Sequence, residues 1–402
     1  MNPDSIRLLD GEFYAGDPYP IYRWLRENSP VHRDEKQGIW GISRFDDVVA
    51  IEKNPLLYPS LPGSRPRSTP DTSMINTDDP HHNQRRRLVS SGFTPRAVRK
   101  HEAEIRGFVA QLIDAIVEKG ECEVVEELAA PLPAMVINRW LGFPPEMWAK
   151  CKWWSEATML AGGQHSEDGS MAFGAAAEAG QAVGEFAQEV LALAALRRKK
   201  PQDDLISIWA NATCEGEKLT DADLIAEALL VLDGGAETTR AVIATTVMNL
   251  IEYPAERQKL VDDPSPEKMT VAVEEFIRWV TPILNMRRTA AKTHELHGRE
   301  IAEGDELLLM YASANRDSAQ FEDPDRYDVG RVKNQHLSFG WGTHFCLGAS
   351  VARLELRLMF EELMKRVPDM QLATGAEPKM IPSAFTRSPD AVHVDFTPSI
   401  PR

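Results

Sequence analysis

Residues 219–253 constrain the fold more than any other segment, because they are predicted to form one very long helix. Leu219-Thr220-Asp221-Ala222-Asp223 resembles a capping box, in which a Thr side chain and an acid three residues later satisfy free amides of the first turn. Apolar residues then recur with helical spacing as far as Tyr253 and Pro254. About 34 residues at a rise of 1.5 Å each give a helix of roughly 50 Å, which would cross the whole molecule.

The rest of the chain is also predicted to be mostly helical. Residues 102–119 and 348–367 each place apolar side chains on one helical face. Short β segments are expected near residues 39–42, 307–309 and 392–394. The chain shows no internal repeat, low-complexity tract or long Gly/Ser linker. We therefore expect a mainly α fold with small β-sheets, in a single domain over residues 1–402.

Charge, hydrophobic pattern and cysteine content exclude several classes of protein. The net charge of −16 argues against nucleic-acid binding, which needs a cationic surface. Because no run of about 18 apolar residues occurs, no membrane anchor is expected. The N-terminal residues lack the basic and apolar regions of a signal peptide, which indicates a cytoplasmic protein. The four cysteines form no Cys-x-x-Cys pair, which argues against a disulfide framework and against a zinc or iron–sulfur site.

Cys346 nevertheless stands where a metal could be held through sulfur. It lies in a glycine-rich turn, residues 339–348, that leads into a predicted helix. Glycines in such a turn allow positive φ and a close approach of the backbone to a flat ligand. Amides just past the cysteine can point at a thiolate and lower its basicity. The alternative is an inert thiol in the protein core.

The middle of the long helix contains the unusual run Gly234-Gly235-Ala236-Glu237-Thr238-Thr239. Each glycine in a helix interior costs about 1 kcal/mol relative to alanine, so some contact or function must offset that cost. The glycines would let a bulky cofactor approach the backbone, and a Thr hydroxyl bonded to a carbonyl can open a groove in the helix. The alternatives are a tight helix crossing at the glycines and a surface carboxylate at Glu237.

Three motifs together resemble those of the cytochromes P-450, in that family's order and spacing. Residues 339–348 match every fixed position of Phe-Gly-x-Gly-x-His-x-Cys-x-Gly. Residues 234–239 match Gly-Gly-x-(Asp/Glu)-Thr-Thr with Glu as the acid, and Glu275-x-x-Arg278 matches Glu-x-x-Arg. The resemblance covers nearly the whole chain and implies the family's helical-prism fold, with haem b as the cofactor.

The resemblance also implies roles for individual residues. Cys346 would be the axial ligand of the haem iron through its thiolate. Glu237 and Thr238 would be catalytic, supplying protons to bound oxygen. Three further residues would contact the cofactor: Gly234, Phe339 and Gly348.

Other positions match the family's elements around the cofactor. Glu275, Arg278 and Arg326 would form a structural ion-pair network beneath the haem. The haem propionates need cationic or hydrogen-bonding partners in a low-dielectric pocket. Four residues match the propionate-binding positions: His82, Arg86, Arg288 and His344. Arg287 could take the role of Arg288, and the sequence does not decide between them.

A basic island stands out in the acidic chain. Its members are Arg85, Arg87, Arg96, Arg99 and Lys100. By the resemblance it should lie on the thiolate side of the haem and receive an acidic ferredoxin, the alternative being a solvated helix face. Residues past 370 contain no flavin or dinucleotide motif. Electrons are therefore expected from NAD(P)H through a separate ferredoxin reductase and ferredoxin.

The expected function is monooxygenation of an apolar small molecule by O₂ and two electrons. Several stretches resemble the branch that hydroxylates sterol side chains and branched lipids at a terminal methyl. Segments 60–78 and 155–180 are expected to line the pocket, with Met74, Met159, Leu160, Met171 and Phe173 as an apolar, adaptable wall. The alternatives are a terpenoid or aromatic hydroxylase of the same family, a peroxide-driven haem peroxygenase, and a non-catalytic haem-binding protein.

Overall fold

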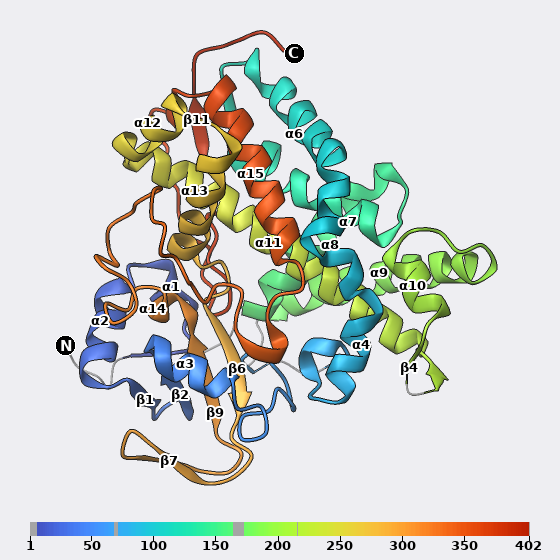
Figure 1. Cartoon of the computed structure of the whole chain (residues 1–402), viewed down its shortest axis with the longest axis vertical. Coiled ribbons are helices and arrows are strands. Elements are labelled where there is room, and N and C mark those ends of the chain that lie inside the picture. The colour runs from blue at the N-terminus through green and yellow to red at the C-terminus, as the bar shows by residue number, and fades with distance from the viewer. Residues whose placement is uncertain (1–5, 68–70, 164–172, 215, 402) are drawn as a thin grey trace.

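Helix α11 (Asp221–Glu252) is 32 residues long and runs through the middle of the helical part of the molecule (Figure 1). The structure is a computed structural model and describes residues 6–67, 71–163, 173–214 and 216–401. The predicted capping box is present, because the Thr220 side chain accepts a hydrogen bond from the Asp223 amide and the Asp223 carboxylate accepts one from the Thr220 amide. The helix therefore begins where the sequence indicates, and it ends directly before Tyr253.

Further helices surround α11 and small sheets complete the fold, which confirms the predicted fold class. The other helices are α1 (Gly11–Ala15), α2 (Tyr19–Asn28), α3 (Phe45–Glu52), α4 (His81–Val89), α5 (Pro95–Val98), α6 (Glu102–Val117), α7 (Pro131–Leu141), α8 (Trp148–Gly163), α9 (Phe173–Lys199), α10 (Leu205–Asn211), α12 (Pro254–Asp262), α13 (Pro266–Val280), α14 (Tyr311–Ala314) and α15 (Ala349–Arg366). The strands are β1 (Val31–Asp34), β2 (Ile39–Ile42), β3 (Glu121–Glu123), β4 (Thr213–Cys214), β5 (Glu217–Lys218), β6 (Asn285–Thr289), β7 (His294–Leu296), β8 (Arg299–Ile301), β9 (Glu306–Met310), β10 (Gln371–Leu372) and β11 (His393–Asp395). No helix in these described parts of the chain is long and apolar enough to cross a membrane.

The main sheet has the strand order β1-β2-β9-β6 and lies in the lower part of Figure 1, beside α1, α2 and α3. Strands β2 and β9 are parallel, whereas β9 and β6 are antiparallel with Arg288 opposite Leu307. Leu307, Leu308 and Leu309 are fully buried, because both faces of β9 are covered. Since successive side chains of a strand point to opposite faces, Arg287 and Arg288 on β6 point in opposite directions.

The large hydrophobic core lies between α11 and the helices packed against it, which include α7, α8, α9, α13 and α15. The helices predicted over residues 102–119 and 348–367 are α6 and α15, and both bury the expected apolar faces. The strands predicted near residues 39–42, 307–309 and 392–394 are β2, β9 and β11. Local periodicity was sufficient for these elements because each buries a continuous apolar face.

The two glycines in the middle of α11 have different surroundings. A Cβ added to Gly235 would overlap the Cδ1 atom of Ile137 on α7 and lie 2.7 Å from its Cγ1. A Cβ added to Gly234 would have nothing within 4 Å. The tight helix crossing therefore accounts for Gly235, while Gly234 borders open space.

We expect Gly235→Ala to lower the free energy of unfolding by about 1 kcal/mol. Overpacking against the buried Ile137 costs about 1–3 kcal/mol, which outweighs the gain of about 1 kcal/mol in helix propensity. Gly234→Ala is the matched control and should keep or raise that free energy. Urea unfolding of both variants measures the difference, and equal stabilities would contradict the crossing as the reason for Gly235.

Candidate functional site

A cavity with about 1560 Å³ of empty space, part of it open to solvent, lies between α11, α15, α4, strand β6 and the turn that carries Cys346. Most of its wall is apolar, and Met74 and Met159 belong to it as the sequence indicated. Met171 and the side chains of Leu160 and Phe173 lie outside the described residues. The cavity brings together the middle of the longest helix and the glycine-rich turn, which are more than 100 residues apart in the sequence.

The turn before Cys346 is shaped by two glycines in the left-handed region. Gly340 has φ +66° and Gly342 has φ +69°. A Cβ at Gly342 would lie 2.6 Å from the carbonyl oxygen of Glu52, so only glycine allows this approach to the end of α3. Gly348 has φ −81° as the N-cap of α15, so the expectation of positive φ does not apply to it. The Cys346 amide donates to the Phe339 carbonyl at 2.8 Å, which closes the turn.

The Cys346 thiol is enclosed at the cavity wall. Burial raises its pKa, and hydrogen bonds from the Gly348 and Ala349 amides act in the opposite direction, together with the charges of Arg86 and Arg353. These amides come from the first turn of α15, as expected from the sequence. The surroundings therefore favour a sulfur that carries negative charge once a positive partner is present.

Helix α11 presents Gly234 and Thr238 to the cavity. The Thr238 hydroxyl donates to the Gly234 carbonyl at 2.8 Å, which is the bond back to the preceding turn that the sequence suggested. Glu237 instead pairs with Arg240, with 2.6 Å between Oε2 and Nη1, and it is mostly buried. Burial raises the pKa of Glu237, while Arg240 opposes that change. Glu237 can therefore hold a proton next to the cavity residue Thr238.

The four residues matched to propionate-binding positions gather at one end of the cavity: His82, Arg86, Arg288 and His344. The His82 and His344 rings lie with centroids 4.0 Å apart, and Arg86 donates to the Phe345 carbonyl at 2.6 Å. Burial, then the nearby positive charges, lower the pKa of His344 to about 2. Arg287 points away from them and pairs with Glu306 at 2.8 Å, so β6 offers Arg288 to the cavity.

This arrangement fits a flat iron cofactor with two carboxylates. The cavity is lined by the Cys346 thiol, by Gly234 with open space beside it, and by the guanidinium groups of Arg86 and Arg288. Phe339 and Gly348 also border the cavity near Cys346. Among the described residues, no group of three or more His, Cys, Asp or Glu side chains could hold a metal ion in another way.

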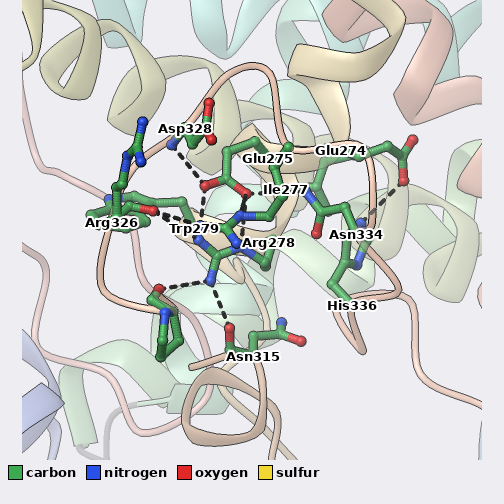
Figure 2. A network of polar contacts seen from close by, with 12 residues as sticks. Glu274, Glu275, Ile277, Arg278, Trp279, Asn315, Arg326, Asp328, Asn334 and His336 are labelled. Carbon is green, nitrogen blue, oxygen red and sulfur yellow. Dashed lines mark hydrogen bonds and ion pairs between the residues drawn. The ribbon is translucent and has the colours of Figure 1, made fainter. Parts of the chain in front are cut away.

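A buried ion-pair network lies beside the Cys346 turn (Figure 2). Arg278 on α13 donates to both carboxylate oxygens of Glu275, at 2.7 and 2.8 Å, and both side chains are fully buried. The predicted participation of the Arg326 side chain is wrong. Arg326 accepts hydrogen bonds through its carbonyl oxygen, whereas Arg331 supplies the second guanidinium, 3.2 Å from Glu275. The path of the loop decides which arginine reaches Glu275, and the motif spacing does not contain that information.

The basic island also differs from the prediction at one residue. Arg85 is buried and pairs with Asp223 at 2.6 Å and with Glu227 at 3.3 Å, both on α11. The other members, Arg87, Arg96, Arg99 and Lys100, are exposed. We call these four residues the basic patch; its part on α5 and the turn after it packs beside α15.

Several cavity residues were missed by the sequence analysis. Glu52 lies in a segment without a recognised motif, so no sequence signal marked it, whereas Arg65 lies in segment 60–78, which was expected to line the pocket. Arg65 pairs with Asp233 at 3.4 Å, and Asp233 accepts from the Thr158 hydroxyl at 2.7 Å. Glu355 did carry a signal, because it interrupts the apolar face of α15 between Ala352 and Met359.

Comparisons with known proteins agree with this geometry. The family profile described as Cytochrome P450 matches residues 267–394. The chain is 40% identical to a steroid C26-monooxygenase of Mycobacterium tuberculosis, over 99% of this chain and 98% of the relative. It is 36% identical to a methyl-branched lipid omega-hydroxylase of the same organism, over 87% of this chain and 82% of the relative. A Mycobacterium marinum cytochrome P450 in complex with pseudoionone superposes with a TM-score of 0.90 at 31% identity, over 98% of this chain and 99% of that one.

We expect Glu355→Gln to remove part of the pH dependence of stability. Glu355 is fully buried, one oxygen accepts from Thr239 at 3.2 Å, and burial raises its pKa from 4.5 to about 8. A raised pKa stabilises the fold below pH about 4.5 and loses that contribution as pH rises towards about 8, with a slope of about 1.4 kcal/mol per pH unit. Urea unfolding at several pH values should therefore give a flatter profile for the variant. Parallel profiles would contradict a neutral Glu355.

Proposed function

The chain belongs to the cytochrome P450 family, and on that premise we propose that it hydroxylates the terminal carbon of a steroid side chain or of a methyl-branched lipid. It is a cytochrome P450 monooxygenase, and the similarity to named monooxygenases favours this over the peroxide-driven and non-catalytic alternatives. The observation that carries the substrate proposal is the largely apolar cavity that Cys346 and Thr238 both line. We also propose that residues 1–402 form a single domain.

The cavity wall supports an apolar substrate. Apolar surface comes from Leu230, Val231, Ile283, Met286 and Phe385, which favours a hydrocarbon ligand. A long chain held with its end at the reactive centre is oxidised at the terminus, because position outweighs the lower strength of internal C–H bonds. A terpenoid substrate is the second candidate, because the similar Mycobacterium marinum structure holds pseudoionone.

Different residues of this chain would hold the cofactor and deliver protons. When bound, haem supplies the activation of dioxygen and the oxidation of the C–H bond. Cys346 would hold the iron, and His82, Arg86, Arg288 and His344 would hold the propionates. The Thr238 hydroxyl donates its single proton to the Gly234 carbonyl, so Oγ1 would accept a hydrogen bond from a protonated group in the cavity and hold that group in place. Glu237 would resupply the proton after leaving Arg240.

Cytochrome P450 monooxygenases take electrons from a redox partner, and we propose an acidic ferredoxin reduced by NAD(P)H through a ferredoxin reductase. The basic patch supports this, because four exposed cations stand out on a chain of net charge −16. It adjoins the Cys346 turn through Arg86, which donates to the Phe345 carbonyl, and the Phe345 side chain is itself exposed. An apolar ring beside a cationic surface suits a small acidic protein carrying a redox centre.

We expect Thr238→Ala to bind substrate and accept electrons but to release most of them as hydrogen peroxide. Removing the hydroxyl removes the acceptor that positions a protonated group in the cavity, so the ratio of product to NAD(P)H consumed should fall several-fold. Thr238→Ser is the matched control and should keep that ratio. Glu237→Gln should slow turnover. Normal rate and product ratio in both Thr238→Ala and Glu237→Gln would mean that these residues only shape α11.

Charge reversal in the basic patch should weaken ferredoxin binding. Arg99→Glu with Lys100→Glu is expected to slow association about tenfold or more at low salt and to reduce its dependence on ionic strength. Lys199→Glu with Lys200→Glu, at the exposed end of α9, changes the charge equally and should leave association nearly unchanged. Stopped-flow reduction of the haem measures both. Equal effects of the two double variants would place the docking surface elsewhere.

The substrate proposal is tested by ligand titration of the haem absorption band. A cholestenone-like steroid or a methyl-branched fatty acid should displace water from the iron and shift the band, and turnover should give the terminal alcohol. Compact terpenes and aromatic compounds are the comparison ligands and should shift the band less. A shift with only these compact ligands would reject the terminal hydroxylation of long chains and leave the monooxygenase class intact.

A further inference from the structure

An acidic side chain stands among the cations at one end of the cavity. Glu52, the last residue of α3, borders the cavity together with Arg288 and His344. Its side chain is almost fully buried, with 1% of its surface exposed. A carboxylate of the protein is unexpected here, because the other charged groups at this place suit the two carboxylates of the cofactor. The position of Glu52 therefore needs a physical explanation.

The contacts of Glu52 involve one of its two oxygens. Oε1 accepts a hydrogen bond from the Tyr311 hydroxyl at 2.7 Å and one from Arg288 at 3.3 Å. Within the described parts of the chain, Oε2 is buried and has no hydrogen-bond partner. The groups that face Glu52 are Arg288 from β6, Tyr311 from α14 and the backbone amide of Trp341 in the Cys346 turn. Among the described residues, Arg288 is the one cation that contacts this carboxylate directly.

A count of charges shows what haem binding would change. Arg86 and Arg288 provide two guanidinium charges at this end of the cavity, and haem brings two propionates. An ionised Glu52 would add a third negative charge beside Arg288, in surroundings where an unpaired charge is very costly.

We propose that Glu52 is a haem-positioning acid, which becomes neutral when haem occupies the cavity and donates its proton in a hydrogen bond to the propionate that shares Arg288. Loading then takes up one proton from solvent. The Glu52 carboxylate becomes a carboxyl group, and its ion pair with Arg288 is replaced by an ion pair between Arg288 and the propionate. Oε2, which lacks a partner, is the oxygen free to carry that proton.

The electrostatics of the protein alone support this assignment. Burial raises the pKa of Glu52, and the charge of Arg288 is the largest opposing influence. A propionate that neutralises Arg288 removes most of that opposition, so the carboxyl form is favoured further. The inference rests on haem binding within the proposed function and is independent of the substrate.

Infrared spectroscopy of the haem-loaded protein at neutral pH tests the proposal directly. A protonated carboxyl group has a carbonyl stretch distinct from that of a carboxylate, and the spectrum of Glu52→Gln should lack one such band. Glu306→Gln is the matched control. Glu306 pairs with Arg287, which lies on the face of β6 opposite to Arg288, so Glu306 should not contribute this band. Tyr311→Phe removes the hydroxyl that donates to Oε1 and should shift the band without abolishing it.

The haem reduction potential gives a second readout. A negative charge beside haem disfavours the reduced state, so the potential of the wild type should fall as pH rises through the ionisation of Glu52, and Glu52→Gln should lose that component. Identical carboxyl bands in the wild type and Glu52→Gln would overturn the proposal. If Glu52→Gln does not load haem, an unshifted band in Tyr311→Phe would overturn it instead. Failure of the wild type to bind haem would reject the proposed function itself.

Discussion

The buried pair of Arg278 and Glu275 is the interaction on which the site depends. Arg278 is fully buried, and besides Glu275 it donates to the carbonyl groups of Asn315 and Pro324 at 2.8 and 3.0 Å. Asn315 in turn donates to Ser338 and accepts from the Leu337 amide. The residues directly before the Cys346 turn are therefore held by the same network. Removing one partner of such a pair costs about 3–5 kcal/mol and would release the chain that positions the thiol.

The sequence predicted those parts of the site that depend on local backbone geometry. The capping box of α11, the positive φ at Gly340 and Gly342, and the amides after Cys346 all follow from residues close together in the chain. It did not predict contacts decided by the path of distant segments. Arg331 replaces the Arg326 side chain beside Glu275, and Arg85 is buried under α11 although it stands in a run of exposed cations.

Glu52 shows the limit of sequence reasoning most clearly. Its partner Arg288 is 236 residues away, and its other contacts come from α14 and the Cys346 turn. Helical periodicity would place Glu52 at an ordinary exposed helix end. Gly342 allows the turn to approach the end of α3 closely, and this approach adds to the burial of Glu52 by Arg288 and Tyr311. A sequence motif therefore identified the Cys346 turn, whereas the position of Glu52 against that turn could be identified only from the structure.

The cavity and α11 beside it contain several acids that a stable core would avoid. Burial raises the pKa of Glu227 to about 7, that of Asp233 to about 6 and that of Glu355 to about 8. Each such group costs stability at neutral pH relative to an apolar residue of similar size, because its charged form is disfavoured by burial. Groups that change protonation near neutral pH are, however, what a site needs if it must accept and release protons. The fold accommodates them because α11, α13 and α15 belong to a large apolar core, part of which also borders the cavity, and burial of that core offsets the cost of these acids.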